Sequence, residues 1–136
     1  MRLILAALAI GSGLAAPAQA TDDVTSFTLE NGLELVVIED HRAPVVVSQL
    51  RYKVGSSYET PGKTGLSHAL EHMMFKGSAK LGPGESSRVL RELGAEENAF
   101  TSDDYTAYYQ VLARDRLPVA LELEADRLAS LQLPAA

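Results

Sequence analysis

The chain has 136 residues, of which 46% are apolar and 22% are charged, so its composition is that of a globular domain rather than of a disordered segment. It carries 12 Lys and Arg against 18 Asp and Glu, a formal net charge of -6. This shortage of positive charge argues against nucleic acid or an anionic membrane surface as the main partner. The chain contains no cysteine, so any metal ion must be held by histidine and carboxylate side chains.

The first 20 residues have the pattern of a cleavable export signal. Arg2 precedes an apolar run at 3–10, and Ala-Gln-Ala at 18–20 is a small-x-small cleavage site. Glycine and proline interrupt the apolar stretch, which is shorter than the roughly 20 residues of a membrane span, so we expect no stable span. We expect cleavage after Ala20, a folded part at 21–136, and an exported location, periplasmic in a Gram-negative bacterium.

The first predicted elements of the folded part are strands. Stretches rich in β-branched and apolar residues at 26–30 and 33–38 flank Asn31-Gly32, a dipeptide that favours a two-residue hairpin turn. A further strand is predicted at 44–54, where apolar and polar residues come to alternate.

Helices and strands then mix along the chain. Either Thr64 or Ser67 can cap a helix that Gly77 is placed to end. A short amphipathic helix is predicted at 85–93, strands at 99–101 and 105–112, and a last helix at 117–131. This order has no regular strand-helix-strand repeat, so it predicts an α+β fold: a largely antiparallel sheet with helices packed on one face.

The first of these helices carries an inverted His-x-x-Glu-His motif (HxxEH), His68 to His72. Histidines four residues apart lie on one helix face and can bind a single zinc ion. Glu71 lies on nearly the same face, so it can take a proton from a water molecule as general base. The motif also occurs by chance, and the alternative is a solvated helix face.

His41 lies in a charged loop and has no ligand partner at helical spacing, so we interpret it as a surface residue.

Further sequence segments before and after the HxxEH motif match the pattern of one known family over most of the chain. From about Phe27 to Leu133 the sequence resembles the insulin-degrading and mitochondrial processing peptidase family, often called pitrilysin-like, whose members carry the HxxEH motif. The segments that carry the resemblance are Asn31-Gly32-Leu33, Tyr52-Lys53-Val54-Gly55-Ser56, Gly65 to Gly77, Gly94-Ala95, Asn98-Ala99-Phe100-Thr101, Asp104 to Tyr109 and Leu123 to Leu128.

The resemblance implies a site. By it, His68 and His72 are ligands of Zn2+, Glu71 is the general base, and Asn98 and Ala99 belong to a sheet edge that takes the substrate as an added strand. Strand addition suits peptides of varied sequence, because main-chain hydrogen bonds supply the binding. For Asn98 the alternative is a turn residue that uses its side chain locally.

The resemblance also implies parts that this chain does not contain. Zinc in proteins takes a further ligand, which the family supplies from a glutamate whose position would lie beyond Ala136, and a second homologous domain or subunit completes the substrate chamber. Residues 21–136 are therefore expected to be part of a peptidase N-terminal domain that, by itself, binds zinc weakly and hydrolyses peptides poorly.

Two kinds of function follow. The leading hypothesis is a zinc metalloendopeptidase that hydrolyses peptides or small unfolded proteins. The alternative is a non-catalytic substrate-binding subunit, or an inactive fragment, of such a peptidase; the presence of His68, Glu71 and His72 together argues against the binding subunit, which needs no base.

Overall fold

The computed structural model describes residues 24–133, and its chain divides into two compact units, one up to His41 and the other from Arg42. Each unit is described by itself. The export signal predicted at residues 1–20 lies outside the described residues and stays a prediction. In the described part, no helix is long and apolar enough to cross a membrane.

The first unit contains the expected hairpin. Strand β1 (Val24–Thr28) pairs with β2 (Glu34–Ile38) in antiparallel fashion, with Val24 opposite Ile38 and Thr28 opposite Glu34. The turn differs from the two-residue form. Leu29 N–H donates to Leu33 O at 2.8 Å, and Gly32 N–H donates to Leu29 O at 2.9 Å, so three residues separate the last bonded pair.

The reason for the longer turn lies in the backbone. A two-residue type I′ turn needs a positive φ at both central residues. Among the described residues only glycines have a positive φ, and Gly32, at φ 84°, is the one in this turn. Asn31 instead uses its Oδ1 atom to accept a hydrogen bond from Leu33 N–H at 3.1 Å.

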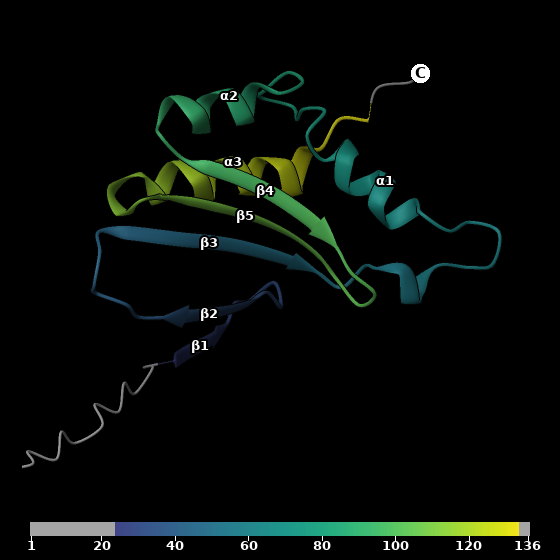
Figure 1. Ribbon diagram of the computed structural model, residues 1–136, viewed down its shortest axis with the longest axis horizontal. Coiled ribbons are helices and arrows are strands. Elements are labelled where there is room, and N and C mark those ends of the chain that lie inside the picture. Colours follow the sequence, from purple (N-terminus) through teal and green to yellow (C-terminus); the bar gives the residue numbers. More distant parts are fainter. Residues whose placement is uncertain (1–23, 134–136) are drawn as a thin grey trace, which may run out of the picture. The chain divides into compact units, whose positions relative to one another are not determined.

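The second unit is built on an antiparallel sheet of three strands in the order β3-β5-β4 (Figure 1). The strands are β3 (Val45–Tyr52), β4 (Glu96–Thr101) and β5 (Thr106–Ala113), so β5 is central and pairs on both sides. The helices are α1 (Leu66–Met73), α2 (Glu85–Glu92) and α3 (Leu117–Ser130), with single 3-10 turns at Ser56–Tyr58 and Arg114–Arg116. The predicted order of elements is confirmed.

The core lies on one face of this sheet. Leu112 on β5 and Leu90 on α2 are almost fully buried, and they form one cluster with Ala95 and with Ala120 of α3. Val46, opposite Leu112 on β3, packs against the same cluster. Because side chains alternate along a strand, these positions share a face, and the helices cover it. This confirms the α+β arrangement with helices on one side of an antiparallel sheet.

A polar network is buried beside this core. Glu124 of α3 accepts hydrogen bonds from Gln110 on β5 and from Arg127 one turn further along α3. The guanidinium of Arg127 lies over the Tyr108 ring, 4.6 Å from its centroid, and 5.4 Å from the centroid of Phe75 just after α1. Ion pairing and cation–π contacts thus join α3, the central strand and the end of α1.

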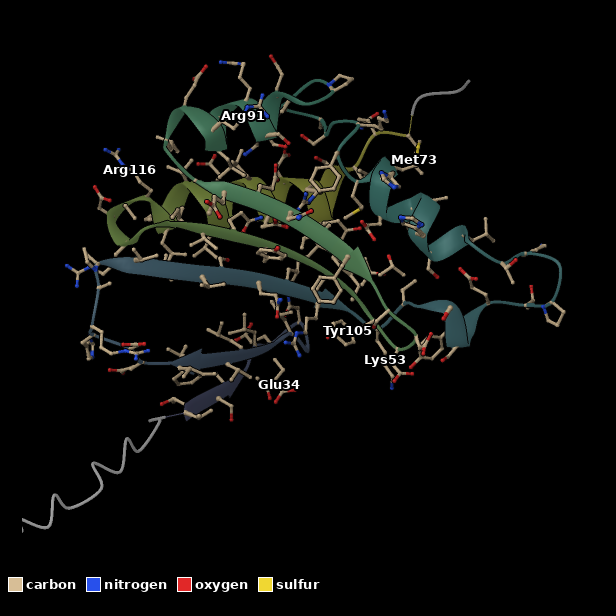
Figure 2. All side chains as sticks on the ribbon, in the orientation of Figure 1. Glu34, Lys53, Met73, Arg91, Tyr105 and Arg116 are labelled. Atoms are coloured by element: carbon tan, nitrogen blue, oxygen red, sulfur yellow. The ribbon has the colours of Figure 1, made fainter. Side chains whose placement is uncertain are left out.

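The loop after α1 is also tied to α3. Ser78 donates a hydrogen bond to the Asp126 carboxylate, and Gln132 N–H donates to Gly77 O at 3.0 Å. Gly77 itself, at φ 120°, lies in this loop and not at the helix end, because α1 already ends at Met73. Figure 2 marks Met73 at that end of α1.

Leu90 gives a test of the core. Leu90→Ala removes a side chain that is only 1% exposed, so it should lower the free energy of unfolding by about 2–5 kcal/mol. Leu121→Ala on α3, where the side chain is 52% exposed, is the matched control and should change it by less than about 0.5 kcal/mol. Urea unfolding of the two variants measures the difference, and equal losses would contradict this assignment of the core.

Candidate functional site

The two histidines of the motif face each other on α1. Their Nε2 atoms are 3.1 Å apart and their ring centroids 4.8 Å apart. The spacing of four residues places both rings on one face of the helix, as expected from the sequence. At this distance, neutral rings can share a hydrogen bond, or both nitrogens can bind one ion.

The distance between the nitrogens fits zinc. A tetrahedral ion with Zn–N bonds of about 2.05 Å holds two nitrogen ligands about 3.3 Å apart, close to the observed separation of the His68 and His72 Nε2 atoms. Two imidazoles are also a donor set that zinc prefers. Across residues 24–133 no group of three His, Asp or Glu side chains converges in a way that could hold a metal ion.

Glu71, between the two histidines in sequence, is held from the sheet. Its side chain is almost buried, and Oε2 accepts a hydrogen bond of 2.5 Å from Thr101 Oγ1 at the end of β4. Thr101 in turn lies 3.2 Å from the hydroxyl of its cross-strand partner Thr106. The hydroxyl of Thr106 donates to Val54 O at 2.9 Å. The carboxylate is therefore fixed relative to the sheet as well as to its own helix.

A cleft of about 450 Å³ separates this helix from the sheet edge. One wall comes from α1 and includes His68 and Glu71, and the opposite wall comes from the end of β4 and the turn after it. Figure 2 marks Tyr105, the last residue of that turn, at this end of the sheet. The residues that line the cleft are Ser56, Glu59, Gly65, His68, Glu71, Ala99, Phe100, Thr101, Ser102 and Asp103.

One end of the cleft is closed by a tight contact between two loops. Ser57 N–H donates to Asp103 O at 2.9 Å, and Ser56 Oγ donates to the Asp103 carboxylate at 2.6 Å. A Cβ atom on Gly55 would lie 2.4 Å from Asp103 O and 2.5 Å from Ser102 O, so only glycine permits this approach. The contact holds the segment before α1 against the turn between β4 and β5.

The edge of β4 borders the cleft. Ser102 N–H donates to Tyr105 O at 2.9 Å, so this pair is hydrogen-bonded and, by alternation, the backbone groups of Ala99 and Thr101 point away from β5. Among residues 24–133 no other strand pairs with this edge. Ala99 lines the cleft. Asn98 does not, and its Oδ1 atom accepts the Ala99 N–H at 2.8 Å, so its side chain is used locally.

The sequence comparison decides the family. Residues 35–135 match the family described as Insulinase (Peptidase family M16). The chain belongs to peptidase family M16. The resemblance noted from the motifs is thereby confirmed over most of the chain.

Relatives in this family include proteins that are named zinc proteases. Zinc protease PqqE of Helicobacter pylori is 39% identical over 109 residues, which cover 79% of this chain and 24% of the relative. Mitochondrial-processing peptidase subunit beta of Dictyostelium discoideum is 37% identical over 102 residues, which cover 74% of this chain and 22% of the relative. The chain thus spans about a quarter of the length of these curated relatives.

Solved structures agree with the M16 assignment. A protease from Helicobacter pylori is similar with a TM-score of 0.80 and 37% identity, over 83% of this chain and 27% of its own. Pitrilysin is similar with a TM-score of 0.76 and 29% identity, over 92% of this chain and 13% of its own. The fold of the described residues is therefore that of part of an M16 peptidase.

His41 is a surface residue of the first unit. Its side chain is 82% exposed, and its Nε2 atom is 3.0 Å from Glu39 Oε2. This agrees with its interpretation as a surface residue.

Glu59 is a site residue that the sequence did not indicate. Neither Thr64 nor Ser67 caps α1; the N-cap is Gly65, at φ 91°, with no side-chain cap of its own. The carboxylate of Glu59 takes that role from the preceding loop, accepting the Gly65 and Ser67 N–H groups at 2.8 Å each. These backbone bonds lower the pKa of Glu59 below its ordinary value.

This cap predicts a pH-dependent contribution to stability. Because the pKa of Glu59 is lowered on folding, its contribution is present above the ordinary glutamate pKa and is lost as the pH falls through the folded-state value. Glu59→Gln should therefore lower the thermal unfolding midpoint at pH 7, and the gap from wild type should close in acid. Glu96→Gln, at an exposed position of β4, is the control and should show no such gap. A gap for Glu59→Gln that is the same at both pH values would contradict the cap.

Proposed function

We propose that this chain carries part of the catalytic site of a zinc metalloendopeptidase, with His68 and His72 as metal ligands and Glu71 as the general base. The observation that carries the proposal is the convergence of the two Nε2 atoms, 3.1 Å apart, on the helix that places Glu71 in the same cleft. The names of the relatives, which include zinc proteases, support the choice of metal.

The residues divide the chemistry between them. When bound, zinc supplies a Lewis acid that polarises the scissile carbonyl and makes water a better nucleophile. The neutral imidazoles of His68 and His72 add no negative charge, so the positive charge of the ion is preserved. Glu71 accepts the proton of the attacking water at a carboxylate oxygen and passes it to the leaving amine. One of its oxygens, Oε2, is held by Thr101, and among the described residues Oε1 has no hydrogen-bond partner.

The substrates proposed are extended peptides or small unfolded proteins. The backbone groups of Ala99 point outward from β4 along the cleft, so a peptide can add there as a further strand through main-chain hydrogen bonds. The Asn98 side chain now accepts the Ala99 N–H, so binding requires Asn98 to release that group and to offer its amide to the peptide. This combines the two expectations for Asn98, a local role without substrate and a binding role with it.

The complete enzyme needs more than the described residues supply. We propose that a third zinc ligand, an acidic side chain, follows Ala136 in the complete protein, and that a second homologous domain or subunit closes the cleft. A relative named as one subunit, the beta subunit of mitochondrial-processing peptidase, supports the second half of this proposal. Export to the periplasm through residues 1–20 also remains a proposal, since it rests on the sequence pattern alone.

Glu71→Gln tests the proposed base. The test uses the complete protein, including any residues that follow Ala136. The substitution keeps the size of the side chain and spares both histidines, but it removes the group that accepts a proton. We expect peptide hydrolysis to fall by about 10²- to 10⁴-fold in kcat with zinc content unchanged. Turnover at the wild-type rate would exclude Glu71 as base and would favour the alternative, a substrate-binding subunit without catalysis.

Zinc content tests the ligands separately. We expect near-stoichiometric zinc after purification in a form extended beyond Ala136, and a large loss in its His68→Ala variant, because one of the two nitrogen ligands is gone. The chain ending at Ala136 should bind zinc more weakly than the extended form. His41→Ala, at an exposed position away from α1, is the matched control and should retain the metal. Equal zinc in the His68→Ala and wild-type forms would refute the ligand assignment.

A further inference from the structure

The side chain of Thr101 connects the sheet to the proposed base. Thr101 is the last residue of β4, and strand alternation turns its side chain toward the helix-covered face, which it shares with Ala99 and with Thr106 across the ladder. On that face its hydroxyl meets the Glu71 carboxylate at 2.5 Å. The contact crosses 30 positions of sequence, from β4 to α1.

Burial makes this contact important for Glu71. The Glu71 side chain is only 8% exposed, and a carboxylate so far removed from water needs hydrogen-bond donors. Within residues 24–133, Thr101 is the single side chain that donates a hydrogen bond to it. Without the hydroxyl, the carboxylate would have to turn toward water in the cleft to recover a partner.

A second buried hydroxyl, that of Thr106, lies beside the Thr101 hydroxyl. Thr106 Oγ1 is 3.2 Å from Thr101 Oγ1 and donates its proton to Val54 O. The Thr106 proton is therefore not available to Thr101 or to Glu71, and the single proton of the Thr101 hydroxyl goes to the nearer, charged acceptor, the Glu71 carboxylate. Thr106 is 3% exposed, and β-branched side chains have few χ1 rotamers in a strand, so both hydroxyls are held in place. The pair forms a rigid support, built from the two residues that flank the turn at 102–105.

We propose that Thr101 is a positioning residue for the hydrolytic reaction: its hydroxyl holds Oε2 of Glu71 and thereby aims Oε1 at the water that Glu71 deprotonates. The inference rests on the proposed function, in which Glu71 is the base. It assigns to the threonine of Asn98-Ala99-Phe100-Thr101 a role separate from the strand addition proposed for Asn98 and Ala99.

The test compares Thr101→Val with Thr101→Ser in the zinc-loaded full-length gene product. Valine keeps the shape and the strand preference of threonine but has no hydroxyl, whereas serine keeps the hydroxyl. We expect Thr101→Val to lower kcat by about 10- to 100-fold with KM, zinc content and unfolding midpoint unchanged, because a misdirected base slows the chemical step only. Thr101→Ser should recover most of the lost kcat. A crystal structure of Thr101→Val should show the Glu71 carboxylate turned from its wild-type position.

Glu71→Gln, assayed beside these variants, distinguishes a failure of the positioning role of Thr101 from a failure of the proposed function. If Glu71→Gln abolishes turnover and Thr101→Val keeps the wild-type kcat, the positioning role is refuted and the proposed function stands. If Glu71→Gln retains turnover, the proposed function itself fails. A Thr101→Val protein that loses zinc or unfolds at a lower temperature, or whose Glu71 carboxylate stays in place, would show a structural role and would overturn the inference.

Discussion

The central strand β5 sets the geometry of the whole second unit, because its pairing on both sides fixes which way every side chain of the sheet points. Leu112, Gln110, Tyr108 and Thr106 all face the helices. From one end to the other they contact the apolar core, the polar network of α3, the rings beside α1 and the hydroxyl pair below Glu71. A shift of β5 by one residue against its two neighbours would turn these four side chains to the other face and remove these contacts at once.

The motif helix depends on this frame because it is too short to be stable alone. At eight residues α1 is below the length at which isolated helices form in water, so tertiary contacts must hold it. Three of these contacts are hydrogen bonds at its start, its middle and the loop beyond its end. Glu59 binds its first N–H groups, Thr101 binds Glu71 in its middle, and the loop beyond its end is bonded to α3 through Ser78. The positions of the two imidazoles therefore follow from residues spread over most of the second unit.

The secondary-structure elements and the HxxEH motif could be predicted from the sequence, but the side-chain contacts that hold the motif in place could not. Periodicity placed the strands and helices to within a few residues, and the spacing of His68, Glu71 and His72 placed them on one face of α1. The support of Glu71 by Thr101 was not predicted, since it depends on the strand register and on how α1 packs. The cap from Glu59 was missed for a related reason: a side chain in the preceding loop outcompeted the local candidates Thr64 and Ser67. The turn at Gly32 differed because Asn31 kept a negative φ.

The open edge of β4 has a cost, because unpaired backbone groups that suit the proposed peptide substrate also suit the edge of another copy. Several features of this strand limit such self-association. It is six residues long, it begins with the exposed Glu96, and the bond from Ala99 N–H to Asn98 Oδ1 satisfies one donor that a second edge would seek. An exposed charge such as that of Glu96 is one of the features by which edge strands resist pairing with one another. The short length of the strand, this charge and the Asn98 side chain thus act together as a guard against aggregation through the open edge.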